Sequence, residues 1–337
     1  MTAETRPQVV PYAIGMTDRF RGITVREGVL LAGPHGWGEF CPFPEYDDAI
    51  ASRWLATAVE ACTVGWPEPV RDRIPVNCIV PAVTPERAAE LVTASGCSTA
   101  KVKVADRPGS LAEDLARVEA VRSALGPSGA VRVDANMRWD ADEAVRALRL
   151  LARAAGELEY AEQPCRTVEE LAEVRRRVDV RIAADESIRQ AADPTRVALG
   201  EAADVAVIKC TPLGGVRRAL EVAESTGLPC VVSSALETSV GLAAQVALAA
   251  SLPELPFACG LGTVSLFLED VVRPGFSLRP EQGFIRVPRT APVPDPARTA
   301  AVEMVDPERR AWWSARLDRA VQGLPQPSAA PFGWRAP

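Results

Sequence analysis

The sequence lacks the clustered histidines and cysteines that carry soft-metal or disulfide chemistry. It contains one histidine, His35, in the turn-like stretch GPHGWGEF, and its eight cysteines are scattered without a CxxC pair. We interpret His35 as a structural or surface residue of a turn. The scattered thiols predict buried cysteines in a cytoplasmic protein, since no secretory leader precedes them.

Long apolar runs and extended basic patches are also missing. The longest apolar candidate, residues 240–252, is interrupted by Gln245 and Ser251, so no stretch is long enough to cross a membrane. The net charge of −6 argues against a nucleic-acid surface, and no Lys/Arg run suggests a patch that follows phosphates. We therefore expect small-molecule partners, no nucleic acid and no membrane. The sequence leaves the oligomeric state open, a monomer included.

What is present is a globular composition arranged in three parts. Hydrophobic residues make up 47% and charged residues 24% of the 337 residues. Residues 1–74 combine strand-like pieces with one helical pattern, as in a small α+β domain. Residues 75–287 alternate strand and helix patterns with eight strand-like runs, the count of a (β/α) barrel. Residues 288–337 are proline-rich, and we expect them to pack on the first domain.

Three acids follow apolar runs at a regular spacing. Asp134 comes after AVRV, Glu162 lies 28 residues later after LEYA, and Asp185 lies 23 residues further on after RIAA. Successive parallel strands deliver their C-terminal side chains to one face of a barrel, so the three carboxylates are predicted to meet there. A divalent cation would offset their repulsion, and an all-oxygen ligand set favours Mg²⁺ over Mn²⁺ and Zn²⁺. The alternative is that each acid caps a helix.

Lysines flank the acids on both sides. Lys101 and Lys103 alternate in the run TAKVKVAD and so point to the same side of a strand, into the barrel mouth. Lys209 ends the run ADVAVIK, 24 residues after Asp185. A metal ion and neighbouring ammonium groups lower the pKa of such a lysine, which can then take a proton from carbon.

Together these motifs resemble the enolase superfamily and, within it, the muconate-lactonizing subgroup. The resemblance rests on the order of KVKV, VDAN, AEQP, ADES, IK and SSALETSVG, and on GWGEFCPFPEYDD at residues 36–48. It implies a modified TIM (β/α) barrel with a small N-terminal α+β capping domain. The single histidine disfavours the branches of the superfamily that use a histidine base, and CGLGT at 259–263 lacks the acids with which dipeptide epimerases hold a substrate amine.

The resemblance also implies a reaction, a lyase activity of menaquinone biosynthesis. EQPCRT at 162–167 and VIKCTPLGG at 207–215 favour syn dehydration of 2-succinyl-6-hydroxy-2,4-cyclohexadiene-1-carboxylate to 2-succinylbenzoate through an ene-diolate. Mg²⁺, with Mn²⁺ as a substitute, would be held by Asp134, Glu162 and Asp185. Lys103 would remove the proton alpha to the carboxylate and return it to the departing hydroxyl. Lys209 would stay protonated on the opposite face.

Further residues are predicted around these groups. Arg132 lies two positions before Asp134 on the same side of its strand, where it would orient a carboxylate or Lys103, or form a buried salt bridge. Asn136 and Glu186 follow metal ligands and would support them, as would Lys101. Hydroxyl and backbone donors for the succinyl tail are expected at the ends of the last two strands; these are Ser233, Ser234, Gly260, Gly262 and Thr263.

Three points stay open at this level. Arg19 and Arg21 in the segment TDRFRGIT would close over the substrate or be solvated. An N-acylamino acid racemase or another epimerase would use the same five groups, with both Lys103 and Lys209 moving protons. A barrel that serves only as a binding or scaffold protein is disfavoured, because so many buried charges would bring it no benefit.

Overall fold

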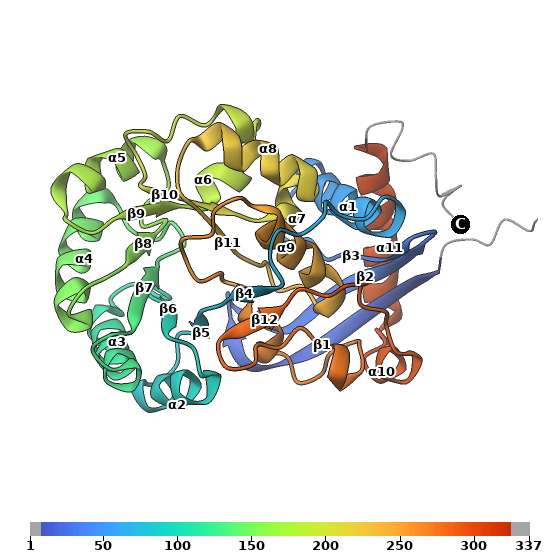
Figure 1. Cartoon of the computed structure of the whole chain (residues 1–337), viewed down its shortest axis with the longest axis horizontal. Coiled ribbons are helices and arrows are strands. Elements are labelled where there is room, and N and C mark those ends of the chain that lie inside the picture. Colours follow the sequence, from blue (N-terminus) through green and yellow to red (C-terminus); the bar gives the residue numbers. More distant parts are fainter. Residues whose placement is uncertain (1–7, 325–337) are drawn as a thin grey trace, which may run out of the picture.

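The computed structural model of the protein describes residues 8–324. The first unit is a small antiparallel sheet covered by one helix (Figure 1). The sheet has the order β1-β2-β3, with β1 (Val9–Phe20), β2 (Ile23–Gly33) and β3 (Gly36–Phe40), and the helix is α1 (Asp48–Thr63). A side chain at Gly38 would overlap the carbonyl oxygen of Ala58, so glycine allows α1 to lie directly on β3.

The second unit is a curled parallel sheet. Its strands follow one another in chain order and are β5 (Cys78–Val80), β6 (Thr99–Lys103), β7 (Ala130–Asp134), β8 (Tyr160–Glu162), β9 (Ile182–Ala184), β10 (Val205–Ile208) and β11 (Cys230–Val232). These are seven of the eight strand-like runs in the sequence. The eighth, FACG, pairs only through single parallel bridges, Val76 with Cys259 and Ser233 with Gly260. The two bridges close the sheet into a barrel.

Helices cover the outside of the barrel (Figure 1). The long ones follow the helical patterns of the sequence: α2 (Pro85–Ser95), α3 (Leu111–Leu125), α4 (Ala141–Ala155), α5 (Val168–Arg177), α8 (Val216–Thr226) and α9 (Ser239–Ser251). The short ones are α6 (Glu186–Arg189), η1 (Pro194–Arg196), α7 (Cys210–Leu213), η2 (Gly262–Leu266) and η3 (Pro274–Phe276). Capping boxes begin α4 at Asp140 and α5 at Thr167, which fixes where those helices start.

The end of the chain returns to the first unit. Strand β12 (Phe284–Arg286) pairs with β4 (Arg73–Pro75), and α10 (Pro296–Ala301) leads to α11 (Pro307–Gln322). Trp313 of α11 is 1% exposed and packs edge-on against Phe40, with ring centroids 6.0 Å apart. Residues 1–7 and 325–337, which include the proline-rich tail, lie outside the described part of the chain. The division into 1–74, 75–287 and 288–337 stays a prediction.

Two buried charged side chains of the small sheet, Arg26 and Glu39, form hydrogen bonds with the loop after β11. The Arg26 guanidinium donates to the carbonyl oxygens of Leu236 at 2.8 Å, of Ala235 at 3.2 Å and of Cys41. The Glu39 carboxylate accepts from the backbone N–H of Thr238 at 3.0 Å. Because Leu236 lies in the left-handed region at φ +65°, these bonds hold a conformation that a leucine rarely adopts.

We expect Arg26→Met to lower the free energy of unfolding by about 3 kcal/mol, because it leaves buried carbonyl groups without a donor. Urea denaturation of the two proteins measures the difference. Arg21→Met is the matched control, since Arg21 stacks on the same Phe43 ring, 4.6 Å from its centroid, but forms no hydrogen bond within residues 8–324. Equal destabilisation by both changes would assign the effect to stacking on Phe43 and contradict the prediction.

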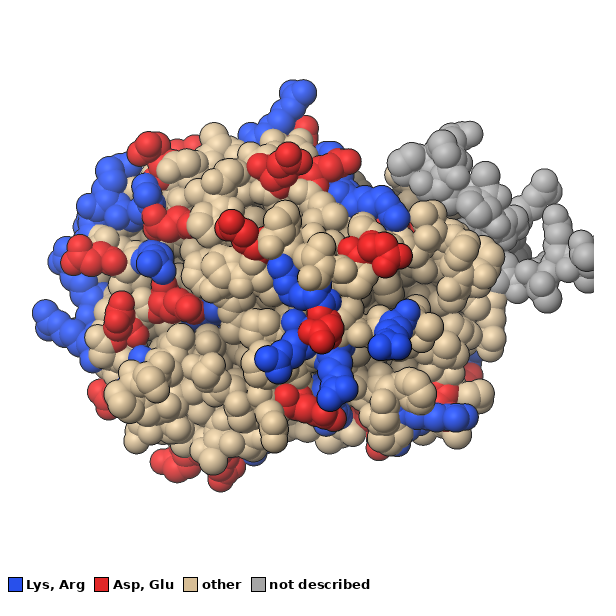
Figure 2. Space-filling model, viewed as in Figure 1, with Lys and Arg blue, Asp and Glu red and all other residues tan. Residues whose placement is uncertain are grey.

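The surface agrees with the composition. On the face shown in Figure 2, basic and acidic side chains are interspersed. No helix within the described residues is sufficiently long and apolar to cross a bilayer.

Candidate active site

The register of the parallel strands brings the predicted acids side by side. Lys103 on β6 pairs with Asp134 on β7, and Asp134 pairs with Glu162 on β8. Glu162 in turn pairs with Ala183 on β9, so Asp185 lies just beyond the end of that strand. The side chains of Asp134, Glu162 and Asp185 are 0–1% exposed. The C-terminal rim of the barrel therefore holds three neighbouring buried carboxylates.

The three predicted lysines pair with these carboxylates. Lys101 Nζ lies 2.7 Å from Glu162 Oε1 and 3.1 Å from Asp134 Oδ2, bridging two acids. Lys103 Nζ donates to Asp134 Oδ2, and Lys209 Nζ lies 2.5 Å from Asp185 Oδ2. Because each ammonium group is buried beside an anion, the site meets the requirement that interior charges be paired.

The three acids differ in the direction in which their surroundings shift their pKa values. Burial and the charge of Asp134 raise the pKa of Glu162 to about 7. Burial also pushes the pKa of Asp134 upward, but the ammonium groups of Lys103 and Lys101 outweigh it and hold that pKa well below its usual value. The pKa of Asp185 is likewise low, because Arg189 and Lys209 together outweigh its burial.

The pKa values of the two lysines on β6 are also shifted in opposite directions. Burial lowers the pKa of Lys103, and Asp134 opposes this only in part. For Lys101 the charges of Glu162 and Asp134 outweigh burial, and its pKa is raised. Of the two lysines on β6, Lys103 is thus the one that more readily becomes a neutral amine.

The donor set suits a hard divalent cation. As the side chains lie, no three Asp, Glu, His or Cys groups among residues 8–324 converge on one point closely enough to bind a metal ion. Lysine ammonium groups contact carboxylate oxygens of all three acids. The ligand atoms available are carboxylate oxygens on adjacent strands, which are the ligands that Mg²⁺ and Mn²⁺ prefer. The residues therefore fit such an ion once these oxygens are released.

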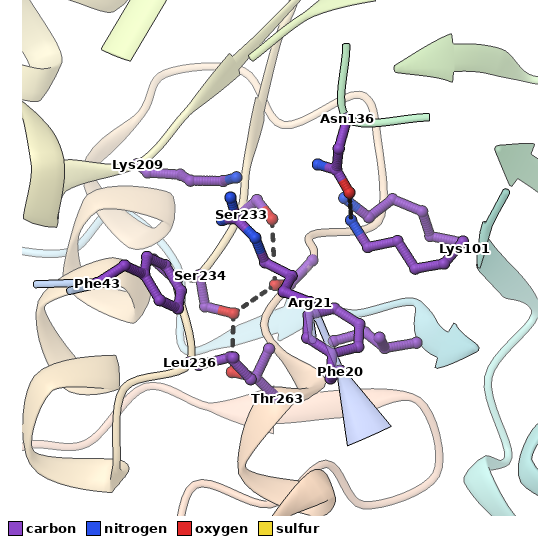
Figure 3. A pocket seen from close by; sticks show the side chains of 14 residues that line it. Phe20, Arg21, Phe43, Lys101, Asn136, Lys209, Ser233, Ser234, Leu236 and Thr263 are labelled. Carbon is purple, nitrogen blue, oxygen red and sulfur yellow. Dashed lines mark hydrogen bonds between the residues drawn. The ribbon is translucent and has the colours of Figure 1, made fainter. Parts of the chain in front are cut away.

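A pocket of about 400 Å³, solvent at its mouth included, opens above these charges. Most of the predicted site residues line it: Lys101, Lys103, Lys209, Asn136, Ser233, Ser234, Gly260 and Thr263. Figure 3 shows Lys209 entering from one side, and Lys101 with Asn136 from the other. Ser234 Oγ lies 2.8 Å from both Thr263 Oγ1 and the Gly260 carbonyl oxygen.

Six predicted residues do not line the pocket: Asp134, Glu162, Asp185 and Glu186, which belong to the charged rim, and two that lie elsewhere. Arg132 donates to Glu159, to Asn77 Oδ1 at 3.1 Å and to Ala258 O at 2.6 Å, so it forms the buried salt bridge and orients neither Lys103 nor a rim acid. It sits beside Lys101 and Tyr160 in the strand register, one layer below Asp134. Gly262 does not line the pocket either, because it begins η2 and packs against the backbone of Asn77.

Glu186 lies behind the acids. Its Oε1 accepts from Asn136 Nδ2 at 3.0 Å and from Arg189 Nη2 at 2.7 Å. Asn136 Oδ1 in turn accepts from Lys103 Nζ at 2.7 Å. Both predicted supporting residues are thus in contact with the rim.

Several pocket residues were not predicted from the sequence. Those on the small domain are Phe20 and Phe43, and those on the barrel are Ile79, Ala235 and Leu236. Of the two open arginines, Arg21 lines the pocket, whereas the Arg19 side chain is 64% exposed and 3.8 Å from Asp106. Arg189, at the end of α6, was not predicted either. Its position four residues after Asp185 could have indicated that its side chain contacts that carboxylate.

Comparisons with known proteins place the chain in a family. A model described as Enolase C-terminal domain-like matches residues 84–292, and one described as Enolase N-terminal domain-like matches residues 11–62. The chain belongs to the enolase superfamily, whose enzymes of this kind depend on a divalent metal ion.

Relatives of high sequence identity indicate the class of enzyme within this superfamily. The o-succinylbenzoate synthase of Thermobifida fusca (strain YX) is 61% identical over 309 residues, which cover 92% of this chain and 94% of the relative. The o-succinylbenzoate synthase of Mycolicibacterium smegmatis is 53% identical over 306 residues, or 90% and 92% of the two chains.

Solved structures confirm the barrel with its capping domain. The muconate lactonizing enzyme from Pseudomonas fluorescens, complexed with muconolactone, aligns with a TM-score of 0.75 at 21% identity, covering 88% of this chain and 98% of the other. The L-Ala-D/L-Glu epimerase from Bacillus subtilis aligns with a TM-score of 0.71 at 24% identity, covering 86% and 96%. At these identities the likeness extends to the fold alone.

Proposed function

We propose that this protein catalyses the o-succinylbenzoate synthase reaction, the syn dehydration of 2-succinyl-6-hydroxy-2,4-cyclohexadiene-1-carboxylate to 2-succinylbenzoate in menaquinone biosynthesis. The observation that carries the proposal is the placement of Lys103 and Lys209 around three buried carboxylates, in a chain whose relatives at 53–61% identity bear that name. Removal of a proton next to a carboxylate needs a base at the carbon and a positive environment for the charge that develops.

The metal ion we propose is Mg²⁺, with Asp134, Glu162 and Asp185 as its ligands and Mn²⁺ as a substitute. When bound, it would act as a Lewis acid toward the ring carboxylate of the substrate. Three carboxylates and three ammonium groups leave the rim close to neutral without it. An added dication disfavours the charged form of a neighbouring lysine, which supports a neutral Lys103.

In this proposal Lys103 moves the proton. Its Nζ takes the proton from the ring carbon next to the carboxylate, and the electron pair of that C–H bond becomes part of an ene-diolate. The same Nζ then returns the proton to the ring hydroxyl, the C–O bond breaks, and water leaves on the face from which the proton came. The burial that lowers the pKa of Lys103 supports its role as the base.

The other pocket groups bind and orient. Lys209, held by Asp185, supplies a fixed positive charge on the opposite face. Ser233, Ser234 and Thr263 would donate to the succinyl tail.

The direct test is conversion of the cyclohexadiene substrate by purified protein, followed as the aromatic absorbance of the product. We expect turnover with Mg²⁺, loss of turnover after chelation with EDTA and recovery on addition of Mg²⁺ or Mn²⁺. Metal should also raise the thermal unfolding midpoint, because a ligand that binds only the folded state stabilises it. Lack of turnover by folded, metal-loaded protein would refute the proposed reaction. Full activity after complete removal of metal would refute the metal role.

A further inference from the structure

Arg189 joins the metal-ligand candidate Asp185 to the small N-terminal domain. It is four residues after Asp185 and three after Glu186, so within the turn of α6 its side chain folds back onto both. Arg189 Nε lies 2.9 Å from Asp185 Oδ1, and Nη2 lies 2.7 Å from Glu186 Oε1. The remaining Nη1 donates to the hydroxyl of Tyr46.

This arrangement divides the two oxygens of Asp185. Oδ1 accepts from Arg189, whereas Oδ2 faces Lys209 on the pocket side. Although Asp185 immediately precedes α6, its side chain forms no capping hydrogen bond. Arg189 therefore holds Oδ1 of the carboxylate and leaves Oδ2 to the rim, where Lys209 contacts it.

The contacts continue to the proposed base. Glu186 Oε1 also accepts from Asn136 Nδ2 at 3.0 Å, and Asn136 Oδ1 accepts from Lys103 Nζ at 2.7 Å. The second oxygen of Glu186 is buried and has no partner among the described residues, so Oε1 alone holds that side chain in place. An unbroken series of hydrogen bonds thus runs from Tyr46 through Arg189 to Lys103.

Tyr46 anchors the other end of this series. It packs edge-on against Phe43, with ring centroids 5.8 Å apart, and its carbonyl oxygen accepts from Arg316 of α11 at 2.6 Å. The Arg189 guanidinium lies 5.8 Å from the centre of the Tyr46 ring and is 3% exposed. A charged fork buried with all three nitrogens engaged gives a rigid support.

We propose that Arg189 is a positioning residue for the metal site, which presets Asp185 through Oδ1 and transmits the position of the small domain through Tyr46. The inference rests on the proposed function, because it takes Asp185 as a metal ligand. Groups that orient a metal ligand from behind typically change metal affinity by about 10- to 100-fold when removed.

The experiment is a Mn²⁺ titration of metal-stripped protein, read from the electron paramagnetic resonance signal of free Mn²⁺ and independent of turnover. We expect Arg189→Gln to weaken binding by about 10- to 100-fold. The Mn²⁺ affinity of Arg189→Lys should lie between those of the parent protein and Arg189→Gln, since lysine keeps the charge but cannot bond several partners at once as a guanidinium does. Tyr46→Phe should weaken Mn²⁺ binding to a smaller extent.

The matched control is Arg53→Gln. Arg53 reaches the same segment from the small domain, donating to the carbonyl oxygens of Arg189 at 3.4 Å, Ala191 at 3.1 Å and Ala192 at 3.0 Å, but among the described residues it bonds neither a rim carboxylate nor the Arg189 side chain. Its Mn²⁺ affinity should stay within about twofold of the parent protein. Circular dichroism verifies folding, and if Arg189→Gln does not fold, Arg189→Lys and Tyr46→Phe decide the question.

The Asp185→Asn variant distinguishes failure of the positioning role from failure of the metal site. Loss of Mn²⁺ binding in Asp185→Asn with parent-like binding in the folded Arg189 and Tyr46 variants would overturn the positioning role and leave the metal site standing. Parent-like binding in Asp185→Asn itself would overturn the metal site and this inference together. An equal loss in Arg53→Gln would show a general effect of joining the domains and would also overturn it.

Discussion

The Lys103→Ala variant is expected to form 2-succinylbenzoate about 10⁴-fold more slowly than the parent protein, the upper end of what one general acid–base group contributes. The reason for so large an effect is that one nitrogen is proposed to perform both proton transfers. Its substitution removes the base in the first step and the acid in the second. Stopped-time assays of aromatic absorbance at saturating substrate and Mg²⁺ measure the difference.

Lys103→Arg is the control for charge. Arginine keeps a cation beside Asp134 but does not give up its proton in proteins, so it should be about as inactive as alanine. Both variants should still bind Mn²⁺, since the three acids are unchanged. Recovery of a tenth or more of the parent rate in Lys103→Arg would mean that Lys103 acts through its charge, and the base would have to be sought elsewhere.

Lys209 should respond differently to the same pair of substitutions. We expect Lys209→Ala to lower kcat by about 10³-fold, comparable to the loss of one preorganised group that stabilises developing negative charge. Lys209→Arg should recover much of that rate, because the proposed role requires a positive charge opposite Lys103 and no proton transfer. Steady-state kinetics with the cyclohexadiene substrate provide both values.

This pair of variants also separates dehydration from epimerisation. An N-acylamino acid racemase would use Lys209 as a second proton donor and acceptor, so arginine would serve it no better than alanine. Equal loss in Lys209→Ala and Lys209→Arg would therefore contradict the single-base proposal. Solvent-deuterium exchange into an N-acylamino acid, measured with the parent protein, gives an independent reading.

The rim acids could be anticipated from sequence because parallel strands obey a simple rule. Asp134 and Glu162 end apolar runs, and the strand register places such positions beside one another. Asp185 follows the next run in the same way. Local sequence therefore carried the information that places these three residues together.

Depth along a strand was harder to predict. Arg132 points to the same side as Asp134, as alternation requires. Two residues along a strand span about 6–7 Å, however, and that distance moves Arg132 from the rim to a salt bridge with Glu159. Alternation reports the face of a sheet and carries no information on how far into the barrel a side chain lies.

Contacts between the two units were beyond local patterns. Phe20 and Phe43 reach the pocket because the small sheet lies against the barrel rim, a relation set by packing between distant segments. The Arg26 contact with Leu236 spans 210 positions of the chain. Periodicity within a window describes each unit but does not dock one on the other.

The packing of Trp313 on Phe40 has a consequence for how the chain is made. The small sheet is complete by Phe40, yet its core includes Trp313 and Leu317 from α11. During synthesis the strands of this sheet leave the ribosome before the barrel does. They can pack against Trp313 and Leu317 only after almost the whole chain has been made. The barrel, whose strands lie between Cys78 and Val232, can pair in the meantime. The part of the molecule that is translated first is thus the last to close its core.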